Sequence, residues 1–194
     1  MASNKKTDNS RLRTKLELRR YYLRKYHSKP PRVFDACQGE GIIWEYLQQE
    51  FECQSYWGVD EKPALGRLKI NSARVLGQPG WDFDVIDIDT YGSPWKHWIA
   101  MLPYILRPVT VFLTIGQITI GGMDPLTLKA LGLEFPSLSL GTISPSLAVK
   151  IGMAHGLPYH LEKAREHGFV IREASEALPA SINGRYIGLH IIPS

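Results

Sequence analysis

Residues 33–41 constrain the fold of this chain more than any other stretch, because they join a strand, a glycine turn and a helix. Two apolar residues after a double proline predict the end of a short buried strand, which stops at Asp35. Gly39 and Gly41 let the turn approach a ligand without a Cβ in the way, and an apolar run with helical spacing follows at 42–47. This order is typical of the first crevice of a doubly wound α/β sheet, where nucleotide-like ligands bind.

The spacing within the turn separates two classes of ligand. A dinucleotide fingerprint, G-x-G-x-x-G, needs a third glycine where this chain has Trp44, so a dinucleotide is disfavoured. The acidic residue before the turn instead resembles motif I of the S-adenosylmethionine (AdoMet)-dependent methyltransferases, D/E-x-G-x-G-x-G, with Cys37 in place of the first glycine. A strand–turn–helix junction that binds no ligand is the alternative for these residues.

Charge is distributed unevenly along the chain. Residues 1–32 contain eleven Lys and Arg against two acids, a net charge of +9, whereas residues 33–194 carry −5. Such asymmetry points to a polyanionic partner for the basic segment. We expect a basic, partly disordered and partly helical extension at 1–32, followed at 33–194 by the methyltransferase-like catalytic domain that the resemblance implies.

The basic segment predicts an amphipathic helix that begins near Arg11, after a Ser10 cap, and docks its apolar face on the sheet. Its basic residues, Lys15 among them, are expected away from that face. Tyrosines interleave with the arginines, which suits phosphate contact together with base stacking. The residues expected to contact nucleic acid are Arg19, Arg20, Arg24 and Lys25. A solvated basic face, a calmodulin-like role and a membrane-surface role are the alternatives.

The next part of the chain supplies a second acidic strand end. A strand at 55–59 ends in Asp60, which is placed to accept hydrogen bonds from the two hydroxyls of a ribose, and the stretch is similar to motif II of the methyltransferases. A helix is expected at 63–70 and a short third strand at 73–76. The nearest candidates to hold an adenine amino group are Asn71 and Ser72.

A fourth strand, at 83–89, runs into the same crevice and is followed by an aromatic ring and a glycine. Methylation of an exocyclic base amine needs an acceptor that orients the amine and a ring that stacks on the base. The stretch resembles motif IV of the tRNA guanine-N2 dimethyltransferases, roughly D-x-D-P-[FY]-G-[ST]-P, and its matching residues are Asp87, Asp89, Tyr91, Gly92, Ser93 and Pro94. Thr90 stands where that family has proline, and this chain is too short for the family's extra C-terminal domain.

This resemblance implies roles for the matched residues. Asp89 and Tyr91 would be the catalytic residues that orient and stack the target, and Asp87 would belong to the cofactor site. The substrate site would include Gly92, Ser93 and Pro94. The alternative is a strand that ends in a tight turn with an incidental Asp.

The remaining segments complete the sheet. We expect a helix at 96–106, a central strand at 109–115, a loop-rich stretch at 118–146, an apolar helix at 144–153, a helix from His160, and strands at 169–173 and 185–192. The last two strands resemble the antiparallel hairpin that follows the parallel strands in AdoMet methyltransferases.

Taken together, these patterns predict a Rossmann-like α/β fold, a seven-stranded doubly wound sheet with a C-terminal antiparallel hairpin. The function expected is AdoMet-dependent methyl transfer to an exocyclic amine of a nucleic-acid base, in RNA (guanine N2-like) or in DNA. The residues expected to hold AdoMet are Asp35, Cys37, Gly39, Gly41, Asp60 and Asp87. A protein or small-molecule methyltransferase, and a non-enzymatic nucleic-acid-binding module, remain alternatives.

Two further expectations concern metals and location. The two cysteines and the histidines have no metal-ligand spacing, so no metal site is expected. No secretory signal and no apolar run of about 18 residues is visible, which predicts a cytoplasmic protein without a membrane span.

Overall fold

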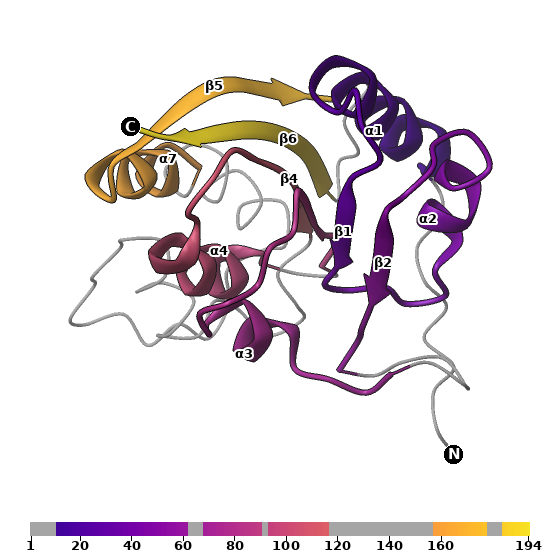
Figure 1. Ribbon diagram of the computed structural model, residues 1–194, viewed down its shortest axis with the longest axis horizontal. Coiled ribbons are helices and arrows are strands. Elements are labelled where there is room, and N and C mark those ends of the chain that lie inside the picture. Colours follow the sequence, from indigo (N-terminus) through magenta and orange to yellow (C-terminus); the bar gives the residue numbers. More distant parts are fainter. Residues whose placement is uncertain (1–10, 62–67, 91–92, 117–156, 178–183) are drawn as a thin grey trace, which may run out of the picture.

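The computed structural model describes residues 11–61, 68–90, 93–116, 157–177 and 184–194 (Figure 1). In chain order its elements are α1 (Leu12–Tyr26), β1 (Arg32–Asp35), α2 (Ile42–Leu47), β2 (Ser55–Gly58), α3 (Ser72–Leu76), β3 (Val85–Ile88), α4 (Trp95–Met101), η1 (Leu102–Tyr104), β4 (Val109–Gly116), α7 (Leu157–Glu166), β5 (Phe169–Glu176) and β6 (Gly184–Pro193). Within these residues, no helix is long and apolar enough to span a membrane.

The strands form one sheet in the order β2-β1-β3-β4-β6-β5. Strands β1 to β4 are parallel, whereas β6 runs antiparallel to both β4 and β5. The chain passes from β1 to β2 on one side and later enters β3 on the other side of β1, so the winding direction reverses between β1 and β3. The predicted doubly wound class and the C-terminal antiparallel hairpin are therefore confirmed.

The structure corrects two local predictions. The described residues hold six strands rather than seven, because the segment expected as the third strand belongs to helix α3. Asn71 caps this helix, since its Oδ1 accepts a hydrogen bond of 3.1 Å from the backbone N–H of Arg74. An apolar run of four residues is too short for its periodicity to separate a strand from a helix.

The predicted helix at 63–70 is also wrong for residues 68–70, the part of it that the structure describes. Lys69 forms an isolated parallel bridge with Asp60, with backbone hydrogen bonds of 3.1 Å from Asp60 N to Leu68 O and 3.0 Å from Ile70 N to Asp60 O. These residues are therefore extended beside the end of β2. The segments predicted at 118–146 and 144–153 lie outside the described residues.

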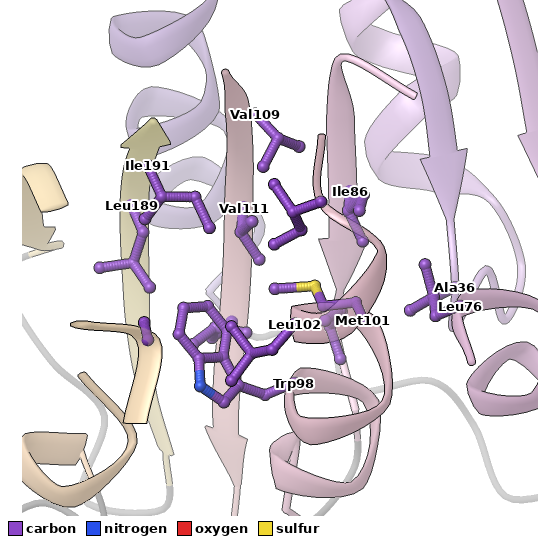
Figure 2. Packing of buried hydrophobic residues seen from close by; sticks show 14 of the residues in the cluster. Ala36, Leu76, Ile86, Trp98, Met101, Leu102, Val109, Val111, Leu189 and Ile191 are labelled. Carbon is purple, nitrogen blue, oxygen red and sulfur yellow. The ribbon is translucent and has the colours of Figure 1, made fainter. Parts of the chain in front are cut away.

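Helices cover both faces of the sheet (Figure 1). Helices α1 and α2 pack on one face, where Val33, Val85 and Phe112 are buried. Helices α3, α4 and α7 pack on the other, and Figure 2 shows Trp98 and Met101 of α4 against Val111, Leu189 and Ile191. Alternate residues of a strand point to opposite faces, so this division also fixes the direction of the polar residues between them.

Helix α1 lies close against the sheet through Tyr22, which is fully buried. The Tyr22 hydroxyl donates a hydrogen bond of 2.6 Å to the carbonyl of Gly188 on β6. A Cβ at position 188 would lie 2.4 Å from the Tyr22 ring, so glycine is required there for the helix to approach. The expected docking of the basic helix on the sheet is confirmed.

Candidate active site

The candidate site lies at the carboxyl ends of β1 and β3, where the winding of the sheet reverses. Open α/β sheets bind ligands in the crevice at this position. Asp35 and Asp87 are register partners in the parallel β1–β3 pair, and Asp89 follows β3 directly. Strand alternation places Asp35 and Asp87 on the face that α1 covers, because Val33 and Val85 lie in that face's core.

The glycine turn after β1 has the geometry predicted for it. Gly39 and Gly41 have φ values of 53° and 78°, a left-handed region that residues with a Cβ rarely adopt. Backbone hydrogen bonds of 2.8 Å from Ala36 N to Asp87 O and 2.9 Å from Gln38 N to Val59 O fix the turn over the sheet. Gly41 then caps α2, so the strand, turn and helix are confirmed.

Asp60 lies beside this turn at the end of β2. Its Oδ2 accepts a hydrogen bond of 3.0 Å from the backbone N–H of Gly39. The second acidic strand end is thus brought to the same crevice as the first, as the sequence predicted.

Asp35 is a buried carboxyl group within this crevice. Its side chain accepts a hydrogen bond of 2.8 Å from the hydroxyl of Tyr56, which in turn accepts one of 3.0 Å from Gln38 Nε2. Burial, together with the nearby charge of Asp87, raises the pKa of Asp35 well above its ordinary value. The other amide atom, Gln38 Oε1, is buried without a hydrogen-bond partner among the described residues.

Asp87 accepts three hydrogen bonds from side chains of two helices. Arg19 of α1, whose side chain is 1% exposed, donates from Nη2 to Oδ1 at 2.6 Å and from Nε to Oδ2 at 2.7 Å. Trp44 of α2 donates from Nε1 to Oδ2 at 2.8 Å. Asp87 therefore joins both helices to the sheet, whereas the sequence suggested a direct contact with the cofactor.

Asp89 is held in a similar way by a neighbouring cation. Lys15 Nζ donates to Oδ1 at 2.9 Å and to Oδ2 at 2.7 Å, and the Thr114 hydroxyl also donates to Oδ1. Burial by itself would raise the pKa of Asp89, but the charges of Lys15 and Arg19 outweigh burial and hold that pKa below its ordinary value. Asp89 is therefore an ionised carboxylate at neutral pH.

The residues after Asp89 are described only in part. Thr90, which replaces the proline of the resembled motif, donates from its hydroxyl to the Thr114 carbonyl at 3.0 Å and so ties this segment to β4. Ser93 Oγ accepts from Trp95 N at 3.4 Å, and Pro94 is the residue before α4. Tyr91 and Gly92 lie outside the described residues, so their expected roles stay predictions.

The basic residues of α1 are placed differently from the expectation. Arg19 is buried against Asp87 and leaves no surface for a phosphate, and Lys15 also points inward; the assignment of both to the free face is wrong. Arg20 pairs with Glu17 and Glu50, and Lys25 pairs with Glu173 at 2.6 Å. Arg24 lies 3.8 Å from Glu50 and remains exposed, with 65% of its side chain accessible.

A small cavity lies between the turn and these carboxylates. It has a volume of about 30 Å³, and its lining includes Asp35, Gln38, Trp44, Asp87 and Asp89. Such a volume holds about one or two waters, so a nucleoside-sized ligand has to widen it. Cys37 also lines it, and burial and the surrounding carboxylates raise the pKa of this thiol well above its ordinary value, so it is not a reactive thiolate.

Sequence reasoning missed several residues of this site. They are Lys15, Gln38, Trp44, Tyr56 and Thr114. For Lys15, the sequence does contain a pattern that could have predicted its place in the site. Lys15 and Arg19 lie four residues apart, which places them on one helix face, and Asp87 and Asp89 lie two apart, which places them on one strand face.

The strand order and the acidic strand ends define a doubly wound α/β sheet with a C-terminal antiparallel hairpin, a fold that solved AdoMet-dependent methyltransferases share. The sequence itself matches no protein-family model and no curated protein. Solved structures match the fold. Trm1 from Pyrococcus horikoshii in complex with S-adenosyl-L-methionine has a TM-score of 0.64 at 14% identity, covering 94% of this chain and 55% of that chain.

Two further neighbours are methyltransferases that are named for other substrates. Magnesium protoporphyrin IX methyltransferase from Synechocystis PCC 6803 with bound SAH has a TM-score of 0.51 at 16% identity, covering 94% of this chain and 83% of its own. The plantazolicin methyltransferase BamL with SAH has a TM-score of 0.56 at 11% identity, covering 95% and 86%. The likeness is one of fold, and this chain spans just over half the length of Trm1.

Proposed function

We propose that this protein is an AdoMet-dependent methyltransferase that acts on an exocyclic amine of a nucleic-acid base. The observation that carries the cofactor assignment is a buried amide oxygen of Gln38 that has no hydrogen-bond partner among the described residues, beside the buried carboxyl of Asp35. A buried carboxyl with a raised pKa and a buried amide oxygen without a partner lie at one small cavity. Both groups are acceptors, so a ligand that brings a cationic donor would satisfy them.

AdoMet fits this donor requirement. Its α-ammonium would bind at Asp35 and the turn of Gly39 and Gly41, and its ribose hydroxyls would bind Asp60. When bound, it supplies a methyl group on a cationic sulfonium. Solved neighbours of the same fold contain AdoMet or SAH, which supports this choice of cofactor.

The reaction is a displacement in which the amine lone pair forms the new N–CH₃ bond while the S–CH₃ electron pair returns to sulfur. The methylated nitrogen then loses its N–H proton to solvent. Asp89 contributes by accepting a hydrogen bond from the amine, which orients the lone pair toward the methyl group. Alignment of this kind supplies much of the rate, so the role of the crevice is to hold the two reactants in line.

The substrate class is supported by the segment after β3 and by charge. Asp89, Ser93 and Pro94 belong to the motif that resembles the guanine-N2 enzymes. Exposed cations lie just before α1 at Arg11 and on α1 at Arg13 and Arg24, where they can meet phosphates, although Arg24 also lies 3.8 Å from Glu50. The ion pairs that engage Arg20 and Lys25 favour the alternative, a small-molecule or protein methyltransferase.

The cofactor is tested by calorimetric titration with AdoMet and with SAH. We expect a Kd on the order of micromolar for the wild type. Asp60→Ala should bind at least about tenfold more weakly, because hydrogen bonds to a charged acceptor contribute about 1.5–3 kcal/mol. Glu61→Ala is the matched control, since Glu61 is the exposed acid next to Asp60 and should leave binding unchanged.

A folded wild type that binds neither AdoMet nor SAH would overturn the enzyme assignment and favour the non-enzymatic module. If binding is found, transfer of labelled methyl from AdoMet to mixed RNA, DNA, peptides and small amines identifies the substrate. Label in RNA or DNA that is lost in an Arg11→Ser, Arg13→Ser and Arg24→Ser triple variant supports the nucleic-acid assignment. Label only in peptides or small amines contradicts it.

A further inference from the structure

Lys15 is an unusual residue to find buried on a helix that packs against a sheet. Its side chain is 7% exposed, and its Nζ lies between the Asp89 carboxylate and the ring of Tyr186, 5.2 Å from the ring centroid. Buried lysines are rare because desolvation of the ammonium is costly, and an apolar residue often serves the fold as well as a buried ion pair. The placement of this charge therefore calls for a reason other than packing.

The backbone geometry of two elements positions this lysine. Lys15 and Arg19 are separated by about 6 Å along the helix axis, and Asp87 and Asp89 by about 6.6 Å along the strand. Because the two spacings match, Lys15 pairs with Asp89 and Arg19 pairs with Asp87, side by side. Arg19 Nη1 also donates to the Lys15 carbonyl at 3.0 Å, which ties the two pairs together on the helix side.

The hydrogen bonds from Lys15 and Thr114 occupy most of the acceptor positions of the Asp89 carboxylate. A carboxylate offers about four acceptor positions. Oδ1 accepts from Lys15 and Thr114, and Oδ2 accepts from Lys15. About one position, on Oδ2, remains for a substrate N–H.

Resting on the proposed function, we propose that Lys15 is a positioning residue for methyl transfer: it fixes the Asp89 carboxylate as a hydrogen-bond acceptor and thereby selects amines that carry no proton at neutral pH. A carboxylate paired with a lysine is a poor proton acceptor. It can orient the amine of a nucleobase, whose nitrogen is already neutral. It favours the protonated form of an alkylamine, whose lone pair is then unavailable for the methyl group.

Other titratable groups also lie near Asp89 and affect its electrostatic environment. They are Arg19 on α1, Asp87 on β3, Asp35 at the end of β1, and Cys37 and Glu40 of the turn that follows, all of which share the crevice or its cavity with Asp89. None of these is changed by substitution of Lys15. A shift in the pH profile of such a variant therefore reports on the Lys15–Asp89 pair.

The test compares Lys15→Met, Lys15→Gln and Lys15→Arg with Arg165→Met, a control at an exposed cation on α7 outside the site. Lys15→Gln keeps a hydrogen-bond donor without the charge, so it serves if Lys15→Met does not fold. We expect the uncharged variants to lose about 10- to 100-fold in kcat while AdoMet affinity changes less than about threefold. Lys15→Arg should recover most of the activity.

The pH profile separates positioning from a structural role. In the uncharged variants burial of Asp89 is no longer opposed by Lys15, so the acidic limb of kcat should move to higher pH by about one unit or more. An unmoved limb in folded variants, or wild-type kcat in Lys15→Met, would overturn the proposal. So would a wild type that methylates lysine side chains or other alkylamines in preference to nucleobase amines.

A second readout does not depend on catalysis. The carboxyl carbon of Asp89, assigned by comparison with Asp89→Asn, can be titrated by NMR in the wild type and in Lys15→Gln. A higher Asp89 pKa in the variant supports the coupling, and an equal pKa contradicts it. This titration needs no substrate. If the wild type shows no methyl transfer, the proposed function is contradicted, but the titration still tests whether Lys15 controls the pKa of Asp89.

Discussion

Arg19 shows how a single charged residue can be required by the fold. Its guanidinium is 1% exposed, binds both oxygens of Asp87 and lies 5.1 Å from the centroid of the Phe112 ring. The planar group presents two parallel N–H donors, a geometry that a lysine cannot reproduce. Asp87 is the partner from the sheet, so each charge depends on the other to be buried.

Removal of one partner should therefore be severe. Arg19→Met should lower the free energy of unfolding by about 3–5 kcal/mol, because it leaves the Asp87 charge buried without its cation. The double variant Arg19→Met, Asp87→Asn should lose less than the sum of the two single variants. Urea denaturation measures both, and Arg13→Met should stay within about 0.5 kcal/mol of the wild type. A loss below about 1 kcal/mol in Arg19→Met would contradict this account.

Helix α1 has two roles: it covers one face of the sheet, and it contributes Lys15 and Arg19 to the candidate site. It runs from Lys15 near the carboxyl ends of β3 and β4 to His27 near the start of β4, where His27 Nε2 lies 2.8 Å from Thr110 Oγ1. The contact between Tyr22 and Gly188 sets its distance from β6. Its position therefore controls where Lys15 and Arg19 reach the carboxylates.

Gly188→Ala should weaken this docking. The new Cβ would overlap the Tyr22 ring, so we expect a loss of about 1–3 kcal/mol in unfolding free energy and weaker AdoMet binding as the helix shifts. In a Tyr22→Leu background the same change should be less costly, because the ring that the Cβ meets is gone. Denaturation of the four variants of this cycle gives the coupling, and additivity would show that the contact does not set the helix position.

The whole molecule has two covering layers, and each contains a partly buried histidine with a lowered pKa. His27 joins α1 to β4 on one face, and His97 of α4 shares a hydrogen bond of 2.8 Å with Ser72 of α3 on the other. Burial lowers the pKa of each to about 4, with smaller effects from His190 on His27 and from Lys96 on His97. Both rings are therefore neutral in the folded state at neutral pH.

Acid should loosen both layers. The unfolded chain binds more protons than the fold between pH 6.5 and 4, so the stability from these two rings is complete above about pH 6.5 and is lost as pH falls toward 4. Each ring contributes at most about 3 kcal/mol to this loss. Chemical denaturation at several pH values measures it. His27→Gln should flatten the profile, and an unchanged slope in that variant would exclude His27 as a source. The raised pKa of Asp35 acts in the opposite direction, so the comparison between variants isolates the histidine.

The sequence by itself determined the local parts of this protein. The strand, turn and helix at 33–47 follow from glycine conformation and short-range periodicity, and the antiparallel pairing of β5 and β6 was predicted from the resemblance of the last two strands to the methyltransferase hairpin. The acidic ends of β1, β2 and β3 were also predicted, because parallel strands bring their carboxyl ends to one edge. These features depend on residues that are neighbours in the chain or on a general rule of sheet topology.

Only the tertiary structure decided where the charges of α1 go. Hydropathy places Lys15 and Arg19 outside, and their buried partners lie 74 and 68 residues further along the chain. An ion pair outweighs the cost of burying a cation only when a fixed carboxylate is already there, and no local pattern contains that information. The same holds for α3, where Asn71 and packing on α4 override a weak strand signal. The docked basic helix that was expected to contact nucleic acid therefore also contributes Lys15 and Arg19 to the candidate site, through contacts with residues distant in the sequence.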